Sequence, residues 1–182
     1  MKKILTPKFF NRDTKKVAEE LLGKFLVRKI AGKEISMMVA ETEAYDGFYD
    51  LASHASKGKT QRTQIMFSNP GKFYVYLCYG MHHMLNVVAR EKGYPAAVLI
   101  RKVGSINGPG KLTKLFKINQ EFNGKMASPS SHLWFEDRGV TVPKSQIKKM
   151  KRVGVEYAGP VWSAKKWRFL VKSKEIDKGF DS

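Results

Sequence analysis

Apolar and polar residues alternate along several stretches of the chain, as they do in strands that bury one face. Turn residues lie at the ends of most of these stretches. The segments between the stretches are rarely long enough for a helix. The predicted strands are residues 25–30, 34–43, 72–78, 85–90, 96–103 and, last, 167–173. Strands that follow one another in this way predict a mixed, largely antiparallel sheet.

Two stretches have helical spacing instead. Asp13 or Thr14 can cap the first helix and Gly23 can end it, while Pro109 suits the first turn of the second. The apolar residues expected to face the core are Val17, Leu21 and Leu22 in the first helix and Leu112, Leu115 and Phe116 in the second. With helices at the edges of the sheet, the pattern indicates an α+β fold, and we expect one domain over residues 1–182.

Composition narrows the function. A chain of 182 residues with 42% hydrophobic residues can fold unaided, and its net charge of +18 favours a polyanionic partner such as nucleic acid. The single cysteine, Cys78, excludes an internal disulfide and suggests no cysteine-based zinc site. The N-terminus has no signal-peptide pattern and no apolar run is long enough for a membrane span, so we expect a cytoplasmic protein without a membrane partner.

The segment ETEAY ends the second predicted strand with two glutamates, Glu41 and Glu43. Residues two apart on a strand share a face, so these carboxylates should lie about 7 Å apart. That spacing suits a glycosidase pair, although solvated or ion-paired glutamates are equally ordinary. Apolar neighbours favour partial burial, which would raise the pKa of these carboxyl groups.

The stretch KFYVYLCYGMHHMLN predicts a hairpin. Tyr74 and Tyr76 should share one face of its first strand, while Phe73, Val75 and Leu77 fill the other. Tyr79 and Met81 would then lie at an exposed tip, where apolar side chains can act as a wedge between base steps. His82 and His83 have no nearby carboxylate or cysteine cluster, which argues against a metal site.

Basic residues cluster in three runs, residues 56–63, 144–152 and 165–168. Each run could be an ordinary solvated face, but together they favour a surface that follows phosphates. From these runs and from NGPGK, which offers backbone amides at a helix start, we expect contacts to the DNA backbone by Arg62, Thr63 and Lys111.

Taken together in chain order, the motifs of this sequence resemble those of the alkyladenine (3-methyladenine) DNA glycosylase family in its compact bacterial form. The set runs from Phe10 to Val171 and includes ETEAY, ASH, YVYLCYGM, VLIR, GPGKL, RVGVEYAG and WRF. The resemblance implies a single mixed domain around a curved antiparallel sheet, with a protruding hairpin, no cofactor and no metal. It also implies an enzyme acting on double-stranded DNA with alkylated or deaminated purines. Because one core with a DNA-facing surface needs no second copy, we expect a monomer.

The resemblance also assigns residues. Glu43 matches the general base, and Arg101 matches the arginine that holds the attacking water with it. A flipped base would lie among Tyr45, His54 and Tyr76. Asn86 matches the residue that crowds the 2-amino group of guanine. Tyr79, with Met81 beside it, matches the DNA-intercalating residues. One carboxylate suffices for a cationic leaving base, so we predict Glu41 to be structural and paired to a lysine.

The chain departs from the family pattern in its loops. Phe48 and Tyr49 replace the usual Pro and Glu, Gln61 replaces a Pro, and residues 101–105 replace R-A-L-E-P. Two other function classes stay open: a nucleic-acid-binding module without turnover, and a carbohydrate hydrolase that uses Glu41 together with Glu43. The reaction that we expect is monofunctional hydrolysis of the N-glycosidic bond, which leaves an abasic site.

Overall fold

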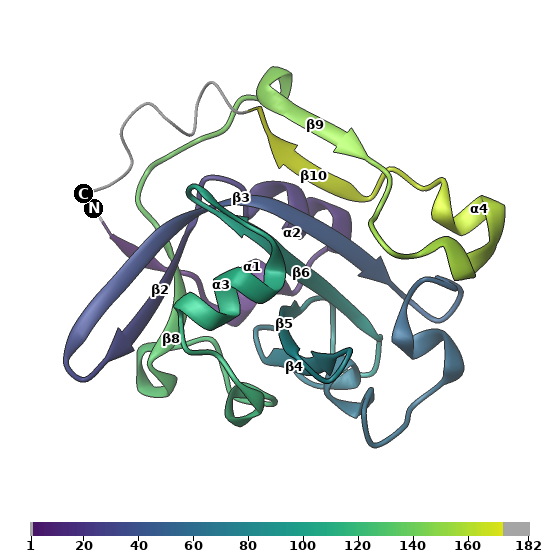
Figure 1. Cartoon of the computed structure of the whole chain (residues 1–182), viewed down its shortest axis with the longest axis horizontal. Helices are drawn as coiled ribbons and strands as arrows, with labels where there is room; N and C mark the ends of the chain where they lie inside the picture. The colour runs from purple at the N-terminus through teal and green to yellow at the C-terminus, as the bar shows by residue number, and fades with distance from the viewer. Residues whose placement is uncertain (1, 173–182) are drawn as a thin grey trace.

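One long strand, β3 (Lys33–Asp46), organises the sheet of this computed structural model, which describes residues 2–172 (Figure 1). Its first half pairs with β2 and its second half with β6, while β10 pairs with residues 41–43. The remaining strands extend the sheet in the order β1-β8-β2-β3-β6-β5-β4, with β7 on β6 and β9 on β10. Every pairing is antiparallel, so the predicted α+β class and the largely antiparallel sheet are confirmed.

The structure contains the six strands that the sequence predicts, with ends that agree to within a few residues, and four strands that the sequence pattern does not predict, β1, β7, β8 and β9. The strands are β1 (Lys3–Ile4), β2 (Phe25–Ile30), β4 (Phe73–Cys78), β5 (His82–Val88), β6 (Ala96–Val103), β7 (Ile106–Asn107), β8 (Leu133–Asp137), β9 (Ile147–Met150) and β10 (Arg168–Val171). The main differences are that β3 continues to Asp46 and that β5 starts at His82. Residue 173, the predicted end of the last strand, lies outside the described residues, as do 1 and 174–182, so one domain over residues 1–182 stays a prediction.

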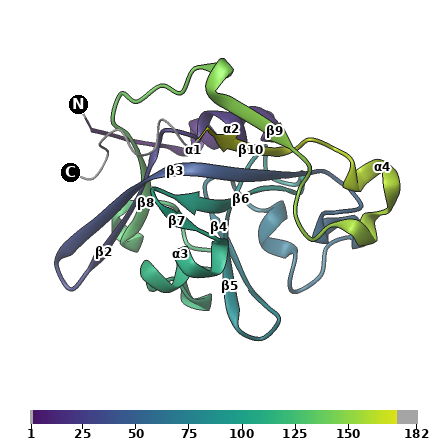
Figure 2. The same ribbon diagram turned by 45° about the horizontal axis from the view of Figure 1, so that its top comes forward.

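Helices cover both faces of the sheet. Besides α1 (Pro7–Phe10) and α4 (Gly159–Ser163), α2 (Thr14–Glu20) packs against β3 and β6 on one face of the sheet, and α3 (Pro109–Leu115) packs against β5 and β6 on the other (Figure 2). The Asp13 carboxylate caps α2 by accepting from two backbone N–H groups, as the sequence predicts. The prediction for Leu115 is wrong, because this side chain is 38% exposed, whereas Leu112 and Phe116, four residues apart, point directly into the core.

The predicted hairpin protrudes from the body of the molecule as β4 and β5 (Figure 2). Its first strand is buried over Phe73, Tyr74 and Val75, but its outer half leaves the core. Leu77 is therefore 44% exposed, and the prediction that it fills the core is wrong.

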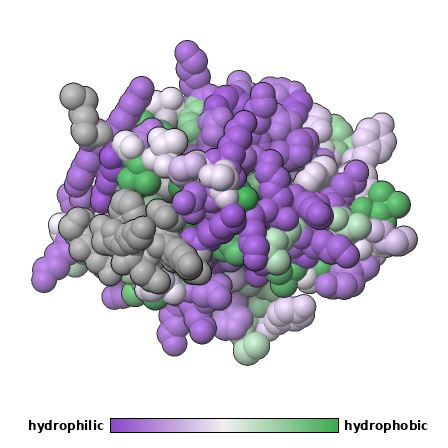
Figure 3. Space-filling view, turned by 90° about the horizontal axis from the view of Figure 1, so that it is seen from above, coloured by the Kyte–Doolittle hydropathy of each residue, from purple (hydrophilic) through white to green (hydrophobic). Residues whose placement is uncertain are grey.

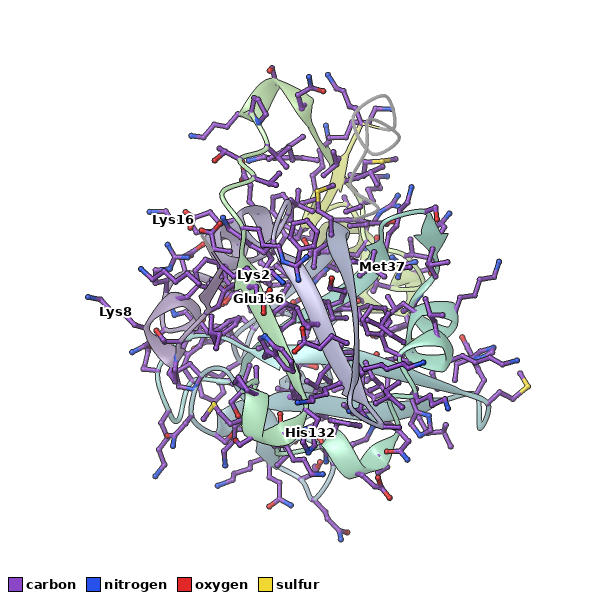
Figure 4. All side chains as sticks on the ribbon, turned by 90° about the vertical axis from the view of Figure 1, so that its left-hand side faces the viewer. Lys2, Lys8, Lys16, Met37, His132 and Glu136 are labelled. Carbon is purple, nitrogen blue, oxygen red and sulfur yellow. The ribbon has the colours of Figure 1, made fainter. Side chains whose placement is uncertain are left out.

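The surface is mostly hydrophilic over β9 and β10 (Figure 3). On the side of α1 and α2, the labelled Lys8 and Lys16 project away from the ribbon (Figure 4). Within residues 2–172, no helix is both long and apolar enough to cross a membrane.

Candidate active site

A pocket of about 500 Å³ opens beside the β4–β5 hairpin, and we call it the aromatic pocket. The second half of β3, the strand β6 and two loops complete its walls. Its lining includes Tyr45, Ala52, Ser53, His54, Arg62, Tyr74, Tyr76, Tyr79, Asn86, Leu99, Arg101, Val153 and Tyr157. The structure thus gathers Arg101 and all four residues that the resemblance assigns to the base pocket, although they are up to 56 positions apart in the chain.

Glu43 lies directly behind this lining, with its side chain 0% exposed. Its Oε1 accepts a hydrogen bond from the Val153 backbone N–H at 2.9 Å, and its Oε2 accepts one from the Tyr45 hydroxyl at 2.8 Å. Burial raises the pKa of the Glu43 carboxyl, and the Arg101 charge and these two hydrogen bonds partly offset that rise. The predicted burial and raised pKa are therefore confirmed for Glu43.

Arg101, on β6, joins the two glutamates of ETEAY. Its Nε lies 3.2 Å from Glu41 Oε1, and its Nη1 lies 3.5 Å from Glu43 Oε1. Glu41 Oε1 also accepts from Arg168 Nη1 at 3.0 Å. The predicted pairing of Glu41 with a lysine is wrong, because the partners are two arginines whose planar, multiply donating heads can bridge carboxylates.

The aromatic walls meet at defined angles. The rings of His54 and Tyr76 are 4.7 Å apart and nearly perpendicular, and those of Tyr74 and Tyr76 are 5.3 Å apart. Burial, together with the charges of Arg62 and Lys57, lowers the pKa of His54 to about 4. His54 is therefore neutral at pH 7, so it lines the pocket as an uncharged ring and lacks the acidic proton of an imidazolium.

Asn86 lies on β5 next to Tyr74 in the pairing of the two hairpin strands. Its Nδ2 donates to the backbone carbonyls of Tyr74, at 3.1 Å, and Met84, at 3.3 Å. These two bonds fix the orientation of a side chain that is only 3% exposed.

Two residues at the hairpin tip are exposed as the sequence predicts. Tyr79 is 88% exposed and Met81 is 72% exposed. Tyr79 has a φ of 50°, and Gly80 follows it with a φ of 67°. The left-handed region costs a tyrosine about 1–2 kcal/mol, so this exposed conformation is maintained against an energetic cost.

The three residues expected on DNA phosphates lie in two places, Arg62 and Thr63 in the loop after His54 and Lys111 on α3. Arg62 is exposed but leans into the pocket, with its guanidinium carbon 5.0 Å from the centroid of the Tyr76 ring. Thr63 is only 3% exposed, and its Oγ1 donates to the Gly58 carbonyl, so its hydroxyl stabilises the loop and we drop it as a phosphate contact. Lys111 is exposed on the first turn of α3.

A glycine allows this helix to approach the hairpin closely. A Cβ atom at Gly110 would lie 2.8 Å from the His82 ring and 3.0 Å from its Cβ. Such an approach leaves no room for a side chain, so glycine keeps α3 against the start of β5, next to the hairpin tip.

Two of the basic runs contain residues that do not face solvent. Arg152 is 3% exposed and forms a bidentate pair with Asp50 at 2.6 and 2.8 Å. Its guanidinium carbon also lies 4.9 Å from the Tyr45 ring centroid. The prediction that these runs belong wholly to a phosphate-binding surface is therefore wrong for Arg152 and for Arg168, which is bound to Glu41.

The sequence predicts no role for three features of the site: the Val153 amide, the Asp50–Arg152 pair and the Tyr74 hydroxyl. The motif RVGVEYAG, which contains Arg152 and Val153, indicates the family but no function for these two residues. The contact between Asp50 and Arg152 joins residues that are 102 positions apart in the chain. Charge pattern alone cannot reveal such a contact, because a basic run looks alike whether or not its last member is buried. Among residues 2–172, no group of three or more His, Cys, Asp or Glu side chains is placed to hold a metal ion.

The chain matches the methylpurine-DNA glycosylase family over residues 8–107 and 102–175, nearly its whole length. It belongs to this family. Similar proteins from Methanocella arvoryzae, Anaeromyxobacter sp. and Borreliella afzelii are each 41% identical to it, over 92–93% of this chain and 89–96% of their own lengths. Each is named "Putative 3-methyladenine DNA glycosylase". The family that the motifs of the sequence predict is thus confirmed.

Proposed function

We propose that the protein is a base-excision repair glycosylase that removes alkylated purines, such as 3-methyladenine and 7-methylguanine, from duplex DNA. It hydrolyses the N-glycosidic bond and leaves an abasic site. The observation that carries this proposal is a buried carboxylate, Glu43, held by Arg101, Tyr45 and the Val153 amide behind an aromatic pocket. Hypoxanthine and ethenoadenine are further candidate substrates.

The reaction needs one base and a good leaving group. Glu43 takes a proton from a water molecule, whose oxygen bonds to the anomeric carbon of the sugar while the carbon–nitrogen bond breaks. The electron pair of that bond leaves with the purine, and an alkylated cationic purine departs as a neutral molecule. The Glu43 charge also stabilises the oxocarbenium-like sugar, and the Arg101 charge favours the ionised carboxylate against the rise in pKa that burial causes.

Base flipping must come first, because no side chain reaches the glycosidic bond inside a duplex. Tyr79 and Met81 form the wedge that fills the vacated space, and the exposed, unfavourable conformation of Tyr79 supports this role. Arg62 and Lys111 are available to phosphates at the rim and on α3. Asn86, fixed by its two backbone bonds, would crowd the 2-amino group of a normal guanine.

The pocket favours purines stacked between electron-rich rings. An alkylated cation gains roughly 0.5–2 kcal/mol by lying against Tyr45 and Tyr76, and a normal neutral base gains less. No lysine of residues 2–172 lines the pocket, which supports a monofunctional hydrolase over an enzyme that forms a Schiff base.

The test is release of free base. Purified protein is incubated with methylated duplex DNA, and 3-methyladenine in solution and abasic sites in the DNA are counted separately. The proposal predicts that the two amounts rise together and that no strand is cut before alkali treatment. A binding module would give salt-sensitive binding without release, and either that result or strand cleavage through a covalent intermediate would contradict the proposal.

A further inference from the structure

Arg62 occupies a place in the pocket that phosphate binding does not explain. Its loop is rich in lysine, yet this guanidinium leans over the Tyr76 ring at 5.0 Å from the centroid and belongs to the pocket lining. Tyr76 is one of the three rings among which the flipped base would lie. A permanent positive charge therefore lies beside the seat of the base.

Arg62 also lies near a second wall of the pocket. The Tyr74 hydroxyl lies 3.0 Å from His54 Nδ1. Burial raises the pKa of Tyr74, and the nearby Arg62 guanidinium partly offsets that rise. Arg62 therefore lies beside Tyr76 and Tyr74, two walls of the pocket, at once.

The charge of Arg62 acts differently on the two kinds of damaged base. A cationic base must share the Tyr76 face with a like charge, or displace it. A neutral base, such as hypoxanthine, meets no repulsion and finds N–H donors for its ring nitrogens or carbonyl oxygen. Those donors would stabilise the negative charge that develops on a neutral purine as it leaves, which neutral His54 cannot do by giving up a proton.

We propose that Arg62 is a specificity-determining residue of the pocket, which lowers the preference for cationic purines and supports the departure of neutral ones. This inference rests on the proposed function, because it concerns the substrate range of the same site. It gives the chain a physical reason to act on deaminated as well as alkylated purines.

The experiment compares two duplexes, one with a single 7-methylguanine and one with a single hypoxanthine. Single-turnover rates are measured at saturating enzyme for wild type, Arg62→Met and Arg62→Lys. Lys59→Met is the matched control, because Lys59 is an exposed charge of the same loop that does not line the pocket. Saturation removes differences in DNA binding from the comparison.

In Arg62→Met, the rate ratio of 7-methylguanine to hypoxanthine should rise by about tenfold, the size of a repulsion between unit charges several ångströms apart near a protein surface. Arg62→Lys should fall between wild type and Arg62→Met, and Lys59→Met should leave the ratio unchanged. An unchanged rate ratio in Arg62→Met would overturn the inference alone, and a salt dependence of binding reduced by about one charge would then assign Arg62 to a phosphate. If wild type releases neither base, the proposed function fails first.

Discussion

The hydroxyl of Tyr45 gives the sharpest test of how the site tunes its base. Tyr45→Phe keeps the ring that would stack on a flipped purine and removes only the hydrogen bond to Glu43 Oε2, which is 2.8 Å long. That bond favours the ionised carboxylate, so its loss raises the pKa of Glu43 beyond the rise that burial already causes. The base must be ionised to act, and the variant should therefore lose activity at low pH.

The size of the effect follows from the kind of bond. A hydrogen bond to a charged group contributes about 1.5–3 kcal/mol, and one pKa unit corresponds to about 1.36 kcal/mol. The acid limb of the rate profile should therefore move upward by about 1–2 pH units. Well above the new limb the rate should approach that of wild type, because stacking is retained.

The assay is a single-turnover pH profile from pH 5 to 9 on one methylated duplex. The rate of each variant is divided by the wild-type rate at the same pH, so that the effect of substrate ionisation cancels. Tyr157→Phe is the matched control, since its hydroxyl also lies at the pocket but donates to the Ala52 carbonyl at 2.9 Å. A control limb that stays at the wild-type position is expected. If the Tyr45→Phe limb also stays there, the hydrogen bond does not tune Glu43 and the reasoning is refuted.

Three further outcomes follow from the same geometry. Glu41→Gln should slow base release at least 10-fold less than Glu43→Gln in the same assay, because Glu41 only holds two arginines; equal losses would favour a carbohydrate-hydrolase pair. Arg152→Met should lower the unfolding free energy by about 3–5 kcal/mol in urea titrations, since it leaves Asp50 buried without its partner, and adding Asp50→Asn should restore part of that loss. Tyr79→Ser should reduce excision from duplex DNA by at least about tenfold while single-stranded substrate is much less affected, because only a duplex leaves a gap to fill; equal losses would argue against the wedge.

Much of the fold follows from local pattern. The sequence predicts the ends of β2 and β6, the Asp13 cap and the helix start at Pro109. These features are predictable because alternation, capping and proline geometry act over a few residues. The ribbon of β9 and β10 is harder to foresee, since its second strand also pairs with β3 more than a hundred positions away. Such pairings depend on the assembled sheet and leave little local trace.

The site divides in the same way. Glu43, Tyr45, His54, Tyr76 and Asn86 are predictable because their motifs are specific, and the structure places the last four on one pocket with Glu43 behind it. The chemistry of their surroundings is not predictable. A guanidinium in a basic run can bind phosphate, pair with Asp50 or stack on Tyr76, and only tertiary packing decides among these fates.

The most direct test of the central claim is the single-turnover release of 3-methyladenine by Glu43→Gln. The amide is nearly isosteric, so the pocket and the DNA-binding surface should persist, which an unchanged DNA affinity and unfolding temperature would verify. We predict a loss of at least about 100-fold relative to wild type at pH 7.5, the usual contribution of a general base. Release at the wild-type rate by a folded, DNA-binding Glu43→Gln would contradict it.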